Sequence, residues 1–120
     1  MAMNQTMIFS YKAPAAANYT ATITFSGSGS TQITGITVNG YQILSGTTTT
    51  TTTPSQVAQR VTVNINACTA TAYNACTING HSASLSGAAV TITSPYAGDA
   101  GLLPIVSKSG AMTVTTTAFV

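Results

Sequence analysis

The 120-residue sequence predicts a mainly β protein, a small antiparallel β-sandwich or barrel-like domain with one short helix at about residues 54–67. Three observations predict this fold class. Apolar residues alternate with threonines, an Asn-Gly dipeptide stands between two β-rich arms, and Gly, Asn, Ser or Pro separate the short apolar segments. We expect a single β-rich domain over residues 18–120, preceded by an N-terminal arm or first strand over residues 1–17.

The strands are predicted in chain order from these patterns. In "NYTATITF" (18–25), apolar residues alternate with threonines, as in a half-buried strand. "TQITGITVNGYQIL" (31–44) predicts a hairpin closed by Asn39 and Gly40, because both positions of a type I′ turn need a positive φ. Gly87 is predicted to close another tight hairpin. Further strands are expected at residues 81–85, 89–93, 103–107 and 111–119.

The segment "PSQVAQRVTVNINACT" (54–69) has two interpretations. It alternates with period 2 like a strand, but four apolar residues also fall on one side of a helix. The preceding residues favour the helix. Thr53 suits the N-cap, Pro54 suits the first helical position, and Gln56 completes a Thr-x-x-Gln capping box. The four apolar residues are Val57, Val61, Ile65 and Cys68.

Seven consecutive threonines, residues 47–53, precede this helix. Thr53 would serve as its cap, and the others lead out of the strand expected to end near Leu44. Because threonine is β-branched and favours extended backbone, the tract is expected to extend that strand or to pack along an adjacent copy. A mobile surface loop is the alternative.

Cys68 and Cys76 enclose the segment "TATAYNA". In the cytosol such a pair is usually reduced, whereas in an extracellular particle it can form a disulfide. We favour the disulfide, which would stabilise the fold by roughly 2 to 3 kcal/mol in the chain-entropy model. The spacing alone leaves both states open.

Charged side chains are scarce, because Lys12, Arg60, Lys108 and Asp99 are the only fixed charges. They make up 3% of the chain, against roughly 25% in an average soluble domain. Disorder does not explain this, since 44% of the residues are hydrophobic and the mean hydropathy is +0.32. A surface of Thr, Ser, Asn and Gly has little self-repulsion, so we expect the protein to pack among copies or neighbours.

Composition excludes several function classes. Three scattered cations cannot neutralise the roughly 6 to 10 phosphates of a typical contact surface, so nucleic-acid binding is not expected. No apolar run approaches the ~18 residues of a membrane span. Residues 1–9 have neither a basic region nor an adequate apolar region, so no secretory signal is expected. One acidic residue cannot supply the paired carboxylates of ordinary glycosidases.

His81, Asp99 and the two cysteines are the remaining groups for catalysis or metal binding. Their spacing matches no local signature. We expect His81 to be a polar residue at a strand end and Asp99 to be a turn residue in "AGDAG". The prediction is therefore a protein without catalytic, cofactor-binding or metal-binding residues, and not an enzyme.

Most of the chain resembles a module found in two classes of protein. The segments that carry the resemblance are "ATITFSGSGSTQITGITVNGYQILSG", "VAQRVTVNINACTA", "GHSASLSGAAVTIT" and "VSKSGAMTVTTTAF". They are similar to a β-module of phage virion structural proteins, of capsid decoration or tail-associated type. They are also similar to modules in the PilC/PilY-type proteins of type IV pili, which carry a similar "INACTA" and a second cysteine. The resemblance implies no catalytic residues.

The resemblance and the composition together imply a structural subunit of a virion, an extracellular particle. Its expected partners are copies of itself and a major capsid or tail protein. The N-terminal arm would bury apolar residues at a contact, or form a first strand of its own sheet. These interface candidates are Met3, Met7, Ile8 and Phe9.

The alternative function is an adhesive module that recognises a cell-surface glycan or protein. Tyrosines gathered on one exposed patch would support it, because their rings combine an apolar face with a polar edge. The candidates are Tyr19, Tyr41, Tyr73 and Tyr96.

Overall fold

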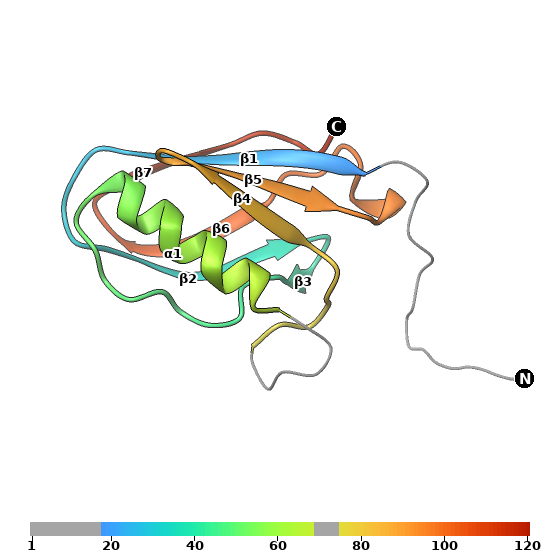
Figure 1. The fold of residues 1–120 in the computed structure, drawn as a ribbon, viewed down its shortest axis with the longest axis horizontal. Coiled ribbons are helices and arrows are strands. Elements are labelled where there is room, and N and C mark those ends of the chain that lie inside the picture. The colour runs from blue at the N-terminus through green and yellow to red at the C-terminus, as the bar shows by residue number, and fades with distance from the viewer. Residues whose placement is uncertain (1–17, 69–74) are drawn as a thin grey trace, which may run out of the picture.

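The computed structural model describes residues 18–68 and 75–120, and Figure 1 shows their arrangement. The structure confirms the predicted fold class: two antiparallel sheets of four and three strands pack with one helix, and no barrel closes. In chain order the elements are β1 (Tyr19–Ser26), β2 (Thr31–Val38), β3 (Tyr41–Gln42), α1 (Pro54–Asn66), β4 (Ser82–Ser86), β5 (Ala89–Ser94), the 3₁₀ turn η2 (Ala97–Asp99), β6 (Ile105–Gly110) and β7 (Thr113–Thr116).

The four-stranded sheet has the order β4-β5-β1-β7. Its central strand β1 alternates as the sequence pattern predicts: Ala21, Ile23 and Phe25 are buried, while Thr20 and Thr24 are exposed. Beyond β7, the chain end continues beside β1. The N–H of Thr117 donates to the carbonyl of Thr22, and Thr20 and Val120 exchange two hydrogen bonds.

The three-stranded sheet has the order β3-β2-β6. Val38 pairs with Tyr41 across a two-residue turn, in which Asn39 has φ 54° and Gly40 has φ 83°. These positive values are those of a type I′ turn. β3 comprises two residues, fewer than the arm expected to run to Leu44. Beyond the Thr37–Gln42 pair, the Gln42 side chain replaces part of the backbone pairing between the two arms. Its Oε1 accepts hydrogen bonds from the N–H groups of Ile36 and Leu44.

The helix α1 lies across the opening between the sheets (Figure 1), in contact with β4, β5, β1 and β2. Thr53 caps it: the Thr53 Oγ1 accepts a hydrogen bond from the N–H of Gln56, and Pro54 occupies the first turn, where its missing N–H leaves no bond unmade. Its inward side presents Val57, Ala58, Val61 and Ile65 to the core.

No helix in the described ranges has the length and apolarity needed to cross a membrane.

The last two strands are shifted or shortened relative to their predicted positions, residues 103–107 and 111–119. β6 begins only at Ile105, because the segment before it pairs elsewhere: the N–H of Gly101 donates to the carbonyl of Phe119, and the N–H of Phe119 donates to the carbonyl of Leu102. β7 begins after Met112, which is buried in the core at the link between the two sheets.

Candidate functional site

The threonine tract lies against β2 of its own chain and does not extend β3. Thr48, 2% exposed, bonds twice to Ile33: its N–H donates to the Ile33 carbonyl and its Oγ1 accepts from the Ile33 N–H, both at 2.9 Å. Further along, Thr51 and Thr31 exchange two backbone hydrogen bonds of 3.1 and 2.8 Å. β-branched, extended residues suit this position, and the hydroxyl of Thr48 satisfies a buried backbone donor.

A pocket of about 240 Å³ opens between the start of this tract and the outer side of α1. Two hydrogen bonds hold its walls together, since the Asn64 Nδ2 donates to the Gly46 carbonyl at 3.0 Å and the N–H of Ser45 donates to the Asn64 carbonyl at 3.1 Å. We name it the Thr–Arg pocket. It is lined by Thr47, Thr48, Thr49, Gln59, Arg60, Val63 and Asn64.

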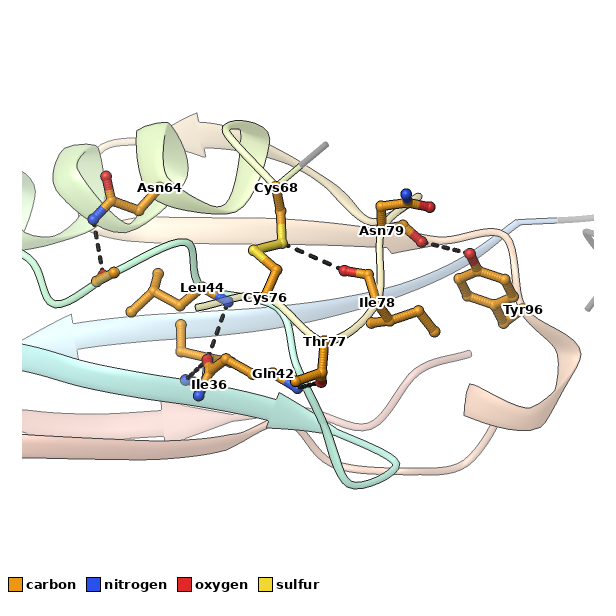
Figure 2. The surroundings of a disulfide bond; sticks show 11 residues. Ile36, Gln42, Leu44, Asn64, Cys68, Cys76, Thr77, Ile78, Asn79 and Tyr96 are labelled. Atoms are coloured by element: carbon orange, nitrogen blue, oxygen red, sulfur yellow. Dashed lines mark hydrogen bonds between the residues drawn. A yellow bond between two sulfur atoms is a disulfide. The ribbon is translucent and has the colours of Figure 1, made fainter. Parts of the chain in front are cut away.

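Cys68 and Cys76 form a disulfide with a Cα–Cα distance of 5.9 Å, within the usual range (Figure 2). The bond joins the C-terminal end of α1 to the segment beside β3. There the N–H of Thr77 donates to the Gln42 carbonyl at 3.0 Å, and the Gln42 N–H donates to the Thr77 Oγ1 at 2.7 Å. The disulfide therefore ties α1 to the three-stranded sheet.

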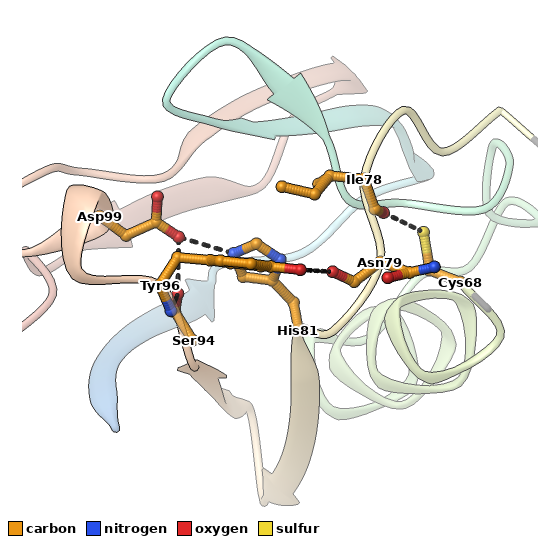
Figure 3. A network of polar contacts seen from close by, with 7 residues as sticks. All are labelled: Cys68, Ile78, Asn79, His81, Ser94, Tyr96 and Asp99. Atoms are coloured by element: carbon orange, nitrogen blue, oxygen red, sulfur yellow. Dashed lines mark hydrogen bonds and ion pairs between the residues drawn. The ribbon is translucent and has the colours of Figure 1, made fainter. Parts of the chain in front are cut away.

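His81, Ser94 and Asp99 form a buried polar group, here named the His81 cluster (Figure 3). One carboxylate oxygen, Asp99 Oδ2, lies 2.7 Å from His81 Nε2 and accepts a hydrogen bond of 2.6 Å from Ser94 Oγ. The ring of Tyr96 packs near the imidazole, with 5.5 Å between their centroids, and its hydroxyl donates to the Asn79 carbonyl.

His81 and Asp99 lie at the positions that the sequence predicts, a strand end and a turn, but their burial and their mutual contact were not predicted. His81 directly precedes β4 and Asp99 lies in η2, yet they are only 6% and 3% exposed and bind each other. Because a buried carboxylate needs hydrogen-bond donors, the single Asp and single His of the sequence are natural partners. The scarcity of charged residues in the sequence was therefore the signal that could have indicated this contact.

Burial lowers the pKa of His81, although the hydrogen bond and the charge of Asp99 oppose that shift. The neutral imidazole then donates its Nε2–H to Asp99, and its buried Nδ1 has no hydrogen-bond partner among the described residues. Ser94 donates to the carboxylate and not to an imidazole nitrogen, so the cluster does not activate a nucleophile in the manner of a catalytic triad. The cysteines, being bonded to each other, supply no thiolate.

We expect the stability of the protein to fall as the pH is lowered from 7 to about 5. Unfolded His81 takes up a proton near pH 6.5, whereas the folded state resists it, so the unfolded state binds more protons below that pH. Chemical denaturation across this range measures the effect. His81→Gln keeps a donor for Asp99, and its free energy of unfolding should change little between pH 7 and 5. The reason is that the chain has no other histidine and no glutamate that could take up a proton in this range. Rising stability on acidification would contradict the prediction.

β6 and β7 each lie at the edge of a sheet. Within residues 18–68 and 75–120, β6 pairs only with β2 and β7 only with β1. Two large aliphatic side chains lie at the start of β6, Ile105 at 65% exposed and Leu103 at 53% exposed. We name β6, β7 and these two residues the β6–β7 edge. Unpaired strand edges with exposed aliphatic residues are suited to pairing with another chain.

Some predicted contact residues are not placed together. Met3, Met7, Ile8 and Phe9 lie outside the described residues, as does Tyr73. Tyr96 is buried in the fold, and Tyr19 and Tyr41 belong to different sheets. The described tyrosines therefore form no single exposed patch.

The described segments contain no group of three or more His, Cys, Asp and Glu side chains that could hold a metal ion.

Comparison of the chain with protein-family models, with curated proteins and with solved structures found no match.

Proposed function

We propose that the protein is a structural subunit of an extracellular particle, a capsid decoration or tail-associated subunit of a phage virion. It acts by packing against copies of itself and against a larger capsid or tail protein. The observation that carries this proposal is the β6–β7 edge, where each strand has only one partner strand among the described residues and where Leu103 and Ile105 are exposed at the start of β6. The proposal also accounts for the near absence of charge, because few ions must lose their hydration when subunits meet.

The partner that we assign to this edge is residues 1–17 of a neighbouring copy. That segment contains the apolar run "MIF" at residues 7–9. Seventeen extended residues reach about 56 Å at about 3.3 Å each, whereas the six residues of β6 span roughly 20 Å. The segment is therefore long enough to pair along the whole of β6, with roughly 36 Å of extended chain to spare.

Light scattering and sedimentation of the full chain over a range of concentrations test this assignment. We expect a discrete oligomer, and we expect Ile105→Lys or Phe9→Asp to raise its dissociation constant at least about 10-fold, since a buried charge without a partner is costly. Leu85→Lys is the matched control, because Leu85 is also an exposed aliphatic residue on an edge strand, β4. A monomer at all concentrations, or equal effects of all three substitutions, would contradict assembly through this edge.

An adhesive module that recognises a cell-surface glycan or protein is the second candidate. The observation that favours it is the Thr–Arg pocket, which combines a cation with hydroxyl and amide groups. The distribution of tyrosines described above adds no support.

A further inference from the structure

We propose that the Thr–Arg pocket binds a carboxylated sugar unit, such as a uronic acid within a glycan. This inference rests on the second candidate function, recognition of a glycan, and is independent of the structural role. The pocket shares no residue with the β6–β7 edge, so binding and assembly can be measured and can fail separately.

The first argument is electrostatic. Arg60 is exposed and permanently charged, and the chain has no acidic side chain left to pair with it. The only acidic side chain, Asp99, is buried against His81 and Ser94. A guanidinium group prefers a planar carboxylate, to which it can donate two parallel hydrogen bonds. An anionic ligand therefore meets no competing side-chain carboxylate of the protein itself.

The second argument is the chemistry of the other walls. The hydroxyls of Thr47 and Thr49 and the amide of Gln59 lie on exposed residues, and such groups both donate and accept hydrogen bonds, as the hydroxyls of a sugar require. Val63, which is 59% exposed, offers methyl groups to the apolar C–H face of a ring. A small inorganic anion can only accept hydrogen bonds, whereas a sugar acid can also donate them through its hydroxyls and can pack its ring against Val63.

The third argument is size and rigidity. The volume of about 240 Å³ is somewhat below the roughly 300 to 1,000 Å³ of pockets for drug-sized ligands, so the pocket suits a ligand of about one sugar ring. Thr48 is held by its two bonds to Ile33, and Asn64 is held by its bond to Gly46. This part of the wall is held in place, so it loses little conformational entropy when a ligand binds.

Titration of the full chain with glucuronate, glucose and sulfate, followed by ligand-observed NMR and calorimetry, tests the proposal. We expect glucuronate to bind with a dissociation constant on the order of 1 mM and glucose to bind at least about 10-fold more weakly. Arg60→Gln should weaken glucuronate binding about 10-fold or more and remove the preference over glucose. Because Arg60 is exposed on α1, this variant should keep its fold, which its circular dichroism would check.

Lys108→Gln is the matched control for sugar binding, since it removes the same charge outside the pocket; its Nζ donates to the Gly110 carbonyl. Because Lys108 lies on β6, light scattering should check that this variant keeps the assembly state of the unchanged protein. It should leave glucuronate binding unchanged. Thr47→Val and Thr49→Val, which keep side-chain shape, should each weaken glucuronate binding more than sulfate binding, because a sugar both donates to and accepts from these hydroxyls. The proposal is overturned if glucuronate does not bind, if Lys108→Gln weakens binding as much as Arg60→Gln, or if sulfate binds equally well and the threonine variants have no effect.

Discussion

Asp99→Leu is expected to lower the free energy of unfolding by roughly 2 to 6 kcal/mol, a large part of the roughly 5 to 15 kcal/mol of a typical domain. One oxygen of Asp99 accepts hydrogen bonds from both His81 and Ser94, and both partners are buried. Leucine has a similar shape but leaves two buried donors without an acceptor, at about 1 to 3 kcal/mol each. Urea denaturation at pH 7 would measure the loss.

Asp99→Asn is the matched variant for this prediction. Since both bonds go to the same oxygen, the single amide oxygen of asparagine can accept them, and we expect a loss of at most about 1 kcal/mol. If the two variants were equally destabilised, the negative charge rather than the shared acceptor would hold the cluster together. If neither were destabilised, the cluster would contribute nothing to folding.

Removing the disulfide is expected to cost about 2 to 3 kcal/mol. The cysteines are 8 positions apart, so the closed loop is short and the entropic gain is at the lower end for disulfides. We expect Cys68→Ala/Cys76→Ala to unfold at lower denaturant concentration than the oxidised protein, and the reduced protein to behave like the double variant. Pulsed alkylation of the thiols before and after reduction would establish the redox state of each sample.

Hydrogen exchange would locate this loss within the fold. The bond lies where α1 meets the segment beside β3, so the amides of Ala75 and Thr77 should lose protection first, because they bond to Ser45 and Gln42. The amide of Ile92, in the sheet on the other side of α1, should change less. Equal loss of protection at all three amides would show that the disulfide stabilises the whole domain and not this junction.

Local sequence signals predict local structure well in this protein. Asn39 and Gly40 suffice to place the β2–β3 turn, because few residue pairs accept two successive positive φ values. The alternation in β1 likewise predicts which side is buried, since the period of a strand is 2. Thr53 and Pro54 place the start of α1 for a similar reason, because a cap satisfies backbone donors within one turn.

Features that depend on distant segments were not predictable in this way. The threonine tract contains no residue that specifies β2 as its neighbour, and that contact arises when the chain returns after β3 to Ile33 and Thr31. The His81 cluster joins residues from β4's start, β5's end and η2, so it depends on the completed sheet. The Thr–Arg pocket depends in the same way on where α1 lies relative to the tract.

The position of β1 between β5 and β7 also determines when the protein can fold. β1 is the first described strand to leave the ribosome, but both of its partners come from the second half of the sequence, and Phe25 pairs with Val114 near the very end. Such non-local pairing makes sandwiches fold slowly, in milliseconds to seconds. At about 5 to 20 residues per second, synthesis leaves this strand without its sheet for several seconds. The four-stranded sheet therefore cannot be completed before β7 has been synthesised, and until then the apolar side of β1 has no sheet around it.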